Sequence, residues 1–347
     1  MNKNDKENTL ADEQYSAAPA TLLDVARRAG VSASTVSRIL NGTAKVADAK
    51  RQNVLEAIKA LNFTPNQLAQ NLKSGNSMTI GIVVQDISSP FFDEALRGVD
   101  EGLKGTGYTS VIVSGHWNAE EEEERIRLLL ARKVDGIIVL SGRLSDEAVL
   151  RYSRTRPIVS TGRNLHTGSA IGFKIDNEHG AFLAVQHLIQ LGHRRIAFVT
   201  GPDDHADAVD RLKGYVRALT EAHIEIDPNL IAAGNFHEVS GLTAVSQLLE
   251  KGQPFSAIFA ANDLSAYGVR LGLYRKGIRV PEDISLVGFD DLPGSAYTAP
   301  PLTTIRQPIY EMGRIAIDAL LDIIEGKQAH REVPPVQLVV RETTRKY

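Results

Sequence analysis

The sequence predicts a small all-α module followed by a larger α/β body made of two doubly wound parallel-sheet subdomains. Three observations predict this fold. The chain has 347 residues, which suffices for two or three domains. Apolar residues with helical spacing occupy residues 21–64. Short apolar runs alternate with helical stretches from residue 77 onward, which is typical of α/β proteins.

Charge is divided unevenly along the chain. Residues 21–75 contain eight basic and three acidic side chains, a net charge of +5, whereas the whole chain carries −3. Residues 1–20 contribute −2, so the remainder carries −6. A basic module attached to an acidic body is typical of a protein whose basic part binds nucleic acid or a membrane. A net charge of +5 is, however, also ordinary for a small domain. The absence of cysteine excludes a disulfide scaffold, a Cys-ligated zinc site and a thiol nucleophile.

The first twenty residues are predicted to form a disordered tail. They are polar and charged, and they lack the apolar segment of a secretory signal. No later stretch approaches the roughly 18 uninterrupted apolar residues of a membrane-spanning helix. We therefore expect a cytoplasmic protein.

Helix signals begin at residue 21. Thr21 and Asp24 have the spacing of a capping box, and Gly30 is placed to end the first helix. Ser32 is a good N-cap for a second helix that runs to Leu40. The expected buried face of this second helix consists of Val36, Ile39 and Leu40.

A third helix is expected at about residues 48–61. Its predicted buried residues are Val54, Leu55, Ile58 and Leu61. Two helices joined by a tight glycine turn, followed by a third, match the helix-turn-helix plan of residues 21–64. A purely structural three-helix bundle has the same spacing, so the spacing alone does not decide between them.

Seven apolar runs in the body predict strands of parallel sheets that are buried on both faces. The runs are residues 80–84, 111–113, 136–140, 157–159, 196–199, 257–260 and 284–287. Helical stretches alternate with them, for example 177–191 and 263–276. Two halves, about 77–175 and 176–305, would each form one doubly wound subdomain.

Polar and aromatic side chains follow several of these predicted strands. Ligands of doubly wound sheets bind at the carboxyl ends of the strands, so these side chains are candidates for a binding site. The candidates are Asp86, Phe91, Trp117, Arg163, Arg211, Asn262 and Asp290. Such side chains suit a sugar, because Asp, Asn and Arg can hydrogen-bond hydroxyls and an aromatic face packs on C–H groups. Burial against a neighbouring helix explains Trp117 and Phe91 equally well.

Two segments carry a resemblance to a known family. TLLDVARRAGVSASTVSRILNG, residues 21–42, resembles the headpiece of the lactose repressor and galactose repressor (LacI/GalR) family of bacterial transcription regulators. PNQLAQNLKSG, residues 65–75, resembles the hinge helix of that family, and we assign residues 65–76 to hinge and linker. The resemblance extends over about residues 21–345. Family members usually have Ser before the third helix; here it is Ala47, so we expect Asp48 to cap that helix.

The resemblance implies a role for individual residues of the module. The second helix would enter the DNA major groove, where Arg38 can donate two hydrogen bonds to guanine or hold a phosphate. The implied DNA-binding residues are Ser32, Ala33, Ser34, Thr35, Ser37, Arg38, Asn41, Ala69 and Leu72. Leu72 matches a leucine that family members wedge into the minor groove, and Ala69 matches a small residue that lets two hinge helices approach.

The resemblance also implies the architecture of the body, residues 77–347. The family fold is like a periplasmic sugar-binding protein, with three crossovers between its halves. Residues 306–332 would return to the first half, and residues 333–347, with a strand near 337–340, would complete the second. Arg211, Asn262 and Asp290 match residues that line the effector site of the family.

Other features of the body are expected to be structural. Residues 120–124 are five consecutive acids, predicted to form a solvated helix face rather than a metal site. His193 precedes a strand and is expected in a surface turn. We predict no metal and no cofactor, because the spacing of His205, Asp207 and Asp210 matches no metal motif and no phosphate-binding loop occurs. No catalytic constellation is present, so we predict that the chain is not an enzyme.

The sequence therefore predicts a sequence-specific transcriptional repressor controlled by a small sugar or sugar derivative bound between the two subdomains. We expect a homodimer on a pseudo-palindromic operator, and no membrane partner. The chain ends without a leucine-heptad tail, so we expect no tetramer. The alternative hypothesis is a sugar-binding protein or α/β enzyme without a DNA role. The sequence leaves open whether the effector releases or promotes DNA binding.

Overall fold

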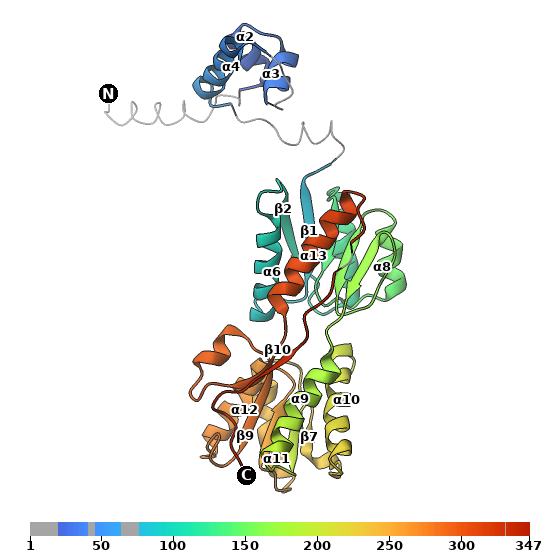
Figure 1. Cartoon of the computed structure of the whole chain (residues 1–347), viewed down its shortest axis with the longest axis vertical. Coiled ribbons are helices and arrows are strands. Elements are labelled where there is room, and N and C mark those ends of the chain that lie inside the picture. The colour runs from blue at the N-terminus through green and yellow to red at the C-terminus, as the bar shows by residue number, and fades with distance from the viewer. Residues whose placement is uncertain (1–19, 41–45, 64–75, 330) are drawn as a thin grey trace, which may run out of the picture. The chain divides into compact units, whose positions relative to one another are not determined.

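The computed structural model describes residues 20–40, 46–63, 76–329 and 331–347. They belong to two compact units, one within residues 1–75 and one within residues 76–347, and each is described by itself. Figure 1 shows the helices of the first unit and the two α/β subdomains of the second. The predicted DNA-binding residues Asn41, Ala69 and Leu72 lie outside the described residues.

Three helices form the described part of the first unit: α2 (Leu22–Ala29), α3 (Ala33–Leu40) and α4 (Asp48–Ala60). The predicted capping box is present, because the Asp24 backbone N–H donates to the Thr21 hydroxyl and the Thr21 N–H donates to the Asp24 carboxylate. Gly30 ends α2 at a φ of 64°. The Thr35 N–H donates to the Ser32 hydroxyl at 3.2 Å, which caps α3 as predicted.

The buried face of α4 differs from the prediction at one position. Leu55 is 49% exposed, whereas Val54 and Ala57 are buried. Ile58 and Leu61 are partly buried against the same small core. Positions 54, 57, 58 and 61 follow the helical repeat and form one stripe. Leu55 lies about 100° around the helix from Val54, so it faces solvent.

The start of α4 is the second correction in this unit. Ala47, not Asp48, occupies the N-cap position, and no side chain there accepts a backbone hydrogen bond. Asp48 is the first helical residue, where its negative charge still favours the positive end of the helix dipole. The helix therefore forms without a side-chain cap.

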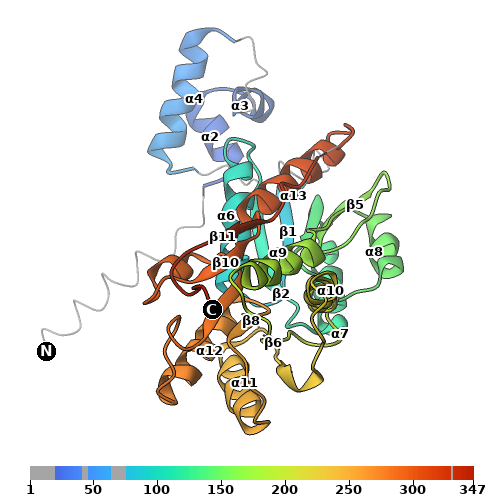
Figure 2. The same cartoon turned by 60° about the horizontal axis from the view of Figure 1, so that its bottom comes forward.

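The first subdomain of the body is a five-stranded parallel sheet. In spatial order its strands are β2 (Thr109–Ser114), β1 (Thr79–Val84), β3 (Gly136–Val139), β4 (Ile158–Thr161) and β5 (Ala170–Phe173). Helices α6 (Pro90–Leu103) and α13 (Ile309–Ile324) pack on one face of this sheet. Helices α7 (Ala119–Ala131) and α8 (Asp146–Ser153) pack on the other. Figures 1 and 2 both show α6 and α13 side by side.

The second subdomain is a six-stranded sheet. Its strands in spatial order are β11 (Gln337–Val339), β10 (Thr303–Arg306), β9 (Ser285–Asp290), β8 (Ala257–Ala260), β6 (Ile196–Val199) and β7 (Ile231–Ala232). Strand β11 runs antiparallel to β10, and the other pairs are parallel. Helices α9 (Asn177–Gln190) and α10 (Ala206–Glu221) cover one face, and α11 (Glu238–Glu250) and α12 (Asp263–Arg275) cover the other.

The chain passes between the two subdomains three times: after β5, after β10 and after α13. Helix α13 therefore packs on the first sheet although both its neighbouring strands, β10 and β11, belong to the second. The predicted fold class, an all-α module and two parallel α/β subdomains, is confirmed. None of the helices in the described part of the chain is both long and apolar enough to cross a bilayer.

The strand predictions differ from the structure at the sheet edges. All seven apolar runs lie in strands, but β5, β7 and β10 were not predicted. Strand β2 is an edge strand, and Ile112 within it is 42% exposed, so the expectation of burial on both faces is wrong there.

The run of five acids at residues 120–124 also differs from the prediction of a solvated helix face. Glu122 is fully buried, and the Gln85 amide and the Arg143 backbone N–H donate to its carboxylate.

Candidate functional site

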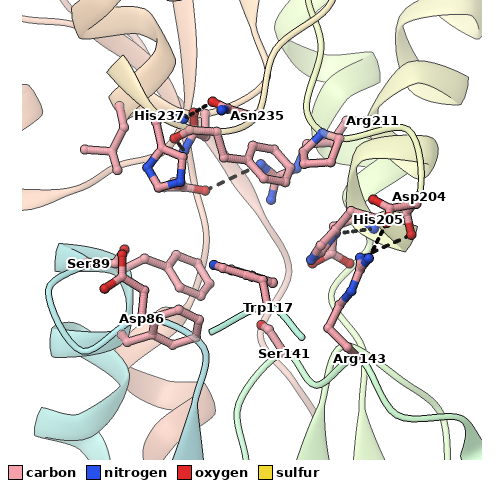
Figure 3. A pocket seen from close by; sticks show the side chains of 18 residues that line it. Asp86, Ser89, Trp117, Ser141, Arg143, Asp204, His205, Arg211, Asn235 and His237 are labelled. Carbon is pink, nitrogen blue, oxygen red and sulfur yellow. Dashed lines mark hydrogen bonds and ion pairs between the residues drawn. The ribbon is translucent and has the colours of Figure 1, made fainter. Parts of the chain in front are cut away.

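A cavity of about 340 Å³ lies between the two subdomains, at the carboxyl ends of strands from both sheets. Six of the seven predicted binding residues line it: Asp86, Phe91, Trp117, Arg211, Asn262 and Asp290. In Figure 3, Asp86, Ser89, Trp117 and Ser141 approach from one side, and Arg211, Asn235 and His237 approach from the other. The cavity is thus a cleft to which both subdomains contribute side chains.

Arg211 is held firmly on helix α10. It is 4% exposed, and its Nε donates to the Asn177 side-chain oxygen at 2.9 Å. One Nη donates to the Ala261 carbonyl, and the guanidinium lies 3.8 Å from the centre of the Phe289 ring. This stacking and these bonds fix the plane of the guanidinium before any ligand arrives.

Asp290 is the carboxylate partner of Arg211. Its Oδ1 lies 3.7 Å from an Arg211 Nη and accepts from the Gln307 amide at 2.6 Å. The residue has a φ of 122° at the end of β9, a strained backbone conformation for a side chain other than glycine. Burial raises the pKa of the Asp290 carboxyl, and the Arg211 charge opposes that shift.

Asn262 ends the loop before α12, and Asp86 lies near the start of the loop after β1; both line the cavity. The Asn262 side-chain oxygen accepts from the Ser265 N–H and caps α12, while its amide donates to the Phe236 carbonyl at 2.9 Å. Asp86 follows β1, and its Oδ1 accepts from the Ser88 N–H and hydroxyl. Each side chain therefore positions a loop and also presents a polar edge to the cavity.

Aromatic rings form much of the remaining wall. The Trp117 ring centre lies 5.1 Å from that of His205 and 6.0 Å from that of Phe92. His205 lies 5.5 Å from Phe236, which belongs to the second subdomain. Trp117 adopts a left-handed φ of 56° in the loop after β2, which turns the ring toward the cavity. Phe91 and Trp117 therefore pack on the core and line the cavity at once.

Arg163 does not line this cavity, contrary to the prediction. Its guanidinium donates to the carbonyl oxygens of Gly142 and Leu144 and to the Asp146 carboxylate, within its own subdomain. It lines a neighbouring cavity of about 540 Å³ that shares six wall residues with the first. Arg163 follows strand β4, so its backbone lies near the cleft. Its long side chain, however, points to the loop after β3.

Sequence reasoning did not assign several wall residues to the site. They are Ser89, Phe92, Ser141, Arg143, Pro202, Asp204, His205, Asp207, Asn235, Phe236, His237 and Leu264. Nine of them lie in loops that follow strands, and the other three, Phe92, Asp207 and Leu264, lie in the first turns of helices. Residues 235–237 follow β7, which has two residues and no apolar run long enough to predict a strand.

An ion pair joins the subdomains at the cleft. The Arg143 guanidinium donates to the Asp204 carboxylate and to its backbone carbonyl (Figure 3). Arg143 comes from the loop after β3 of the first sheet, and Asp204 comes from the loop after β6 of the second. Among the described residues, no cluster of three or more histidine, aspartate or glutamate side chains is placed to hold a metal ion.

Helix α3 and its capping residue Ser32 carry the six described DNA-binding candidates. Ser32, Ser34 and Arg38 are exposed, while Ala33, Thr35 and Ser37 are half-buried. The Ser32 hydroxyl is hydrogen-bonded to the hydroxyls of Ser34 and Thr35, at 2.9 Å and 2.8 Å. Val36 and Ile39 anchor the opposite face of the helix in the core. The helix thus presents small polar groups and one guanidinium on its outer side.

We expect Asp290→Asn to remove part of the pH dependence of stability. Because folding raises the Asp290 pKa, this group stabilises the fold below about pH 4 and loses that contribution as pH rises through the raised folded value. Urea unfolding between roughly pH 4 and pH 8 measures the effect. The decrease of the unfolding free energy with rising pH should be smaller in Asp290→Asn than in the parent protein. The exposed control Asp203→Asn should show the same decrease as the parent. Equal slopes in the parent and Asp290→Asn proteins would contradict the expectation.

Comparison with known families identifies both units. The model for bacterial regulatory proteins of the lacI family matches residues 21–66. The model for the periplasmic binding protein-like domain matches residues 185–344. The two matches follow the division into a helical module and an α/β body.

Full-length relatives agree with these matches. The HTH-type transcriptional repressor PurR of Vibrio atlanticus (strain LGP32) is 38% identical over 316 residues, covering 90% of this chain and 95% of the relative. The HTH-type transcriptional repressor CytR of Escherichia coli (strain K12) is 36% identical over 329 residues, covering 94% and 96%. Both relatives are regulators rather than enzymes.

Solved structures show the same architecture. The lac repressor dimer bound to operator and the anti-inducer ONPF superposes with a TM-score of 0.85 at 31% identity, covering 94% of this chain and 100% of that one. The transcriptional regulator CelR–cellobiose complex gives a TM-score of 0.69 at 35% identity, covering 93% and 99%. The chain therefore belongs to the lacI family of bacterial regulatory proteins, as a helix-turn-helix transcriptional repressor with an effector-binding body.

Proposed function

We propose that this repressor binds a pseudo-palindromic operator as a homodimer, and that a small sugar-like effector in the cleft controls the binding. The exposed polar face of α3, held by the buried Val36 and Ile39, is the observation that carries the DNA-binding part. The lac repressor and CelR structures support the proposal, since the first contains a dimer on its operator and the second contains cellobiose.

Helix α3 is the proposed reading helix. Arg38 is exposed near its C-terminal end, and its planar guanidinium can donate two hydrogen bonds to the O6 and N7 of guanine. Ser34 can hydrogen-bond a base or a phosphate, and Ala33 can contact a thymine methyl group. Ser32 is better suited to structure than to DNA, because its hydroxyl oxygen already caps α3.

The cleft suits a ligand with a ring and several hydroxyl groups. Trp117, Phe91 and Phe236 offer apolar faces for a ring, while Arg211, Asn262 and Asp290 offer hydrogen-bonding edges. Asp86 adds a carboxylate from the opposite subdomain. A ligand that touches both subdomains stabilises one angle between them over others.

That angle is the proposed link between effector and operator. Segment 65–76 joins the body to the headpiece, so a change of angle in the body would alter the spacing of two headpieces in a dimer. The coupling is reciprocal: an effector that weakens operator binding is itself bound more weakly by the operator complex. The factor by which effector changes the affinity for operator should equal the factor by which operator changes the affinity for effector. Operator titrations with and without effector, and effector titrations with and without operator, test this equality.

We expect Arg38→Ala to weaken binding to an operator selected from random duplex DNA by about 10- to 100-fold, because a bidentate contact to guanine is lost. Arg38→Lys is the matched control, since it keeps the positive charge and lacks the fork. It should lose most of the sequence discrimination and keep the salt dependence of binding. Fluorescence anisotropy at several salt concentrations measures both quantities.

One outcome would contradict the proposed function, and another would contradict the role of Arg38 alone. Failure of the parent protein to enrich any duplex sequence, with or without candidate effectors, would overturn the DNA-binding function and favour a sugar-binding role alone. Full operator affinity and specificity in Arg38→Ala would remove Arg38 from the reading surface while leaving the function standing.

A further inference from the structure

The walls of the cleft carry a negative net charge. Four carboxylates line the cavity, from Asp86, Asp204, Asp207 and Asp290, against two guanidinium groups, from Arg143 and Arg211. The net charge of these six groups is −2 when Asp290 is ionised and −1 when Asp290 is protonated. Of the two histidines in the wall, burial lowers the pKa of His205, which keeps it neutral at pH 7, and His237 lies exposed at the rim.

Both guanidinium groups already have a carboxyl group beside them. Arg143 is ion-paired with Asp204, and Arg211 lies 3.7 Å from the Asp290 carboxylate. Arg211 is also held by Asn177 and by the Ala261 carbonyl, so it cannot turn toward a second anion without breaking these bonds. An incoming phosphate or carboxylate would therefore meet two cations that are already held by other groups, in a wall whose net charge is −2 with Asp290 ionised and −1 with Asp290 protonated.

Helix dipoles do not reverse this balance. Helices α6, α10, α11 and α12 all begin at the cavity, and their N-termini carry partial positive charge. Each of them has an acidic residue in its first turn: Asp93, Asp207, Glu238 and Asp263, respectively. These carboxylates offset the dipoles, and Asp207 does so inside the cavity itself.

Asp207 has the central place in this arrangement. It lies in the first turn of α10, and its Oδ1 accepts from the Asn177 amide at 3.0 Å. It lines the main cavity and the neighbouring cavity that contains Arg163. No lysine or arginine of the described residues forms a salt bridge with it, although the charge of Arg211 acts on it from a greater distance, so Asp207 adds negative charge to the ligand space.

We propose that the cleft selects an effector without negative charge, a neutral polyhydroxylated ring compound rather than a sugar phosphate or sugar acid, and that Asp207 is a main determinant of this selection. The inference rests on the proposed effector function of the same cleft. Its physical basis is like-charge repulsion in a partly desolvated space, where a phosphate monoester brings a charge of about −1.5 to −2 at pH 7. The neutral form of a ligand keeps its ring contacts and hydroxyl bonds and avoids this repulsion.

The only tryptophan of the chain lies in the cavity wall, so its fluorescence measures the local charge without a known ligand. Trp117 is half-buried and accessible to small quenchers. Stern–Volmer titrations of the full-length protein would use iodide, caesium and neutral acrylamide at constant ionic strength, normalised to free N-acetyltryptophanamide. We expect caesium to quench Trp117 at least about twice as efficiently as iodide, because the negative potential concentrates cations.

Two single-charge variants sharpen this test. Asp207→Asn keeps an oxygen that can accept from Asn177, and it should raise the ratio of iodide to caesium quenching by about 1.5-fold or more. Asp203→Asn is the matched control, because Asp203 lies four residues away, is exposed and does not line the cavity. The control should leave the ratio unchanged. Preferential quenching by iodide, or equal shifts in both variants, would overturn the proposal.

Matched ligand pairs provide the second arm. Trp117 fluorescence and thermal shift would compare ribose, glucose, cytidine and inosine with their 5′- or 6′-monophosphates. If a compound of the panel binds saturably, we expect it to be a neutral one, and we expect its monophosphate to bind with an affinity lower by about 100-fold or more. The Asp207→Asn variant should reduce this ratio of affinities by about 10-fold. Saturable binding of a phosphate whose neutral parent does not bind would overturn the proposal.

Failure of the inference is distinguishable from failure of the proposed function. Operator binding by a protein whose cleft admits phosphates would leave the repressor standing and reject the charge selection. If the quenching data show a negatively charged cleft but the protein binds no duplex DNA, the charge selection stands and the repressor function is rejected. The quenching arm gives a result even if none of the tested sugars and nucleosides binds.

Discussion

Replacing Arg211 by alanine is expected to abolish the response to effector while operator binding without effector stays intact. The guanidinium is buried, stacks on Phe289 and lies beside Asp290 at the floor of the cleft. Its loss removes a rigid donor and leaves the Asp290 carboxyl without its cationic neighbour. We expect affinity for a sugar or nucleoside that raises the melting temperature of the parent protein to fall by about 100-fold or more.

Arg217→Ala is the matched control for this experiment. It lies on the same helix, α10, but its side chain is 38% exposed and pairs with Glu178 outside the cavity. Trp117 fluorescence titrations and operator anisotropy should show parent-like behaviour for this variant. Thermal unfolding of both variants checks that the body remains folded. Parent-like ligand affinity in Arg211→Ala would remove Arg211 from the proposed site.

Gly313→Ala is expected to destabilise the body by about 3 kcal/mol or more. A Cβ atom at Gly313 of α13 would overlap the backbone carbonyl of Ala95 in α6, far inside van der Waals contact. The reciprocal position, Gly98 of α6, would overlap the Tyr310 carbonyl of α13 in the same way. Backbone atoms cannot move aside like a flexible side chain, so the helices must separate and the shared core of the first sheet loosens.

Urea or thermal unfolding of the full-length protein measures this loss. Gly168→Ala is the control, because no heavy atom lies within 4 Å of the Cβ that it would add and its φ is not left-handed. We expect that variant to change the stability by less than about 1 kcal/mol, in either direction. A Gly313→Ala protein as stable as Gly168→Ala would show that α6 and α13 can separate without cost.

Local chemistry made the headpiece predictable. The Thr21–Asp24 capping box, the left-handed Gly30 and the Ser32 cap depend on residues no more than three positions apart. These signals act within one helix end, so they do not need the rest of the fold. Leu55 was misplaced because adjacent apolar residues at 54 and 55 compete for one stripe, and the packing of α4 on α2 decides between them.

Buried polar residues in the body escaped prediction for a different reason. Glu122 lies within a run of acids, yet it is fully buried and accepts hydrogen bonds from Gln85 and from the backbone at residues 143 and 144. His193 is 2% exposed rather than a surface residue, and its ring nitrogens bond Ser256 and the Arg345 carbonyl. These partners are 21 to 152 residues away, so no local pattern reveals them.

The site was only partly predictable from position along the chain. Asp86 and Asn262 follow strands with clear apolar runs, and both line the cavity. Phe236 follows the two-residue strand β7, which carries no such run. Arg163 follows β4 as correctly predicted, but bonds to Gly142 and Leu144 turn it away from the main cavity.

By itself the sequence determined the caps of α2 and α3, the two α/β halves, the charge contrast between module and body, and the family. These depend on short-range spacing and composition, which survive without knowledge of contacts. Tertiary structure alone decided which long side chains reach the cleft, that Arg143 pairs with Asp204 across it, and that Arg211 is already paired with Asp290. Such pairings join residues more than 60 apart in the chain, and their direction depends on packing that no local pattern encodes. The charge of the cleft, and with it the class of effector proposed here, follows from those pairings.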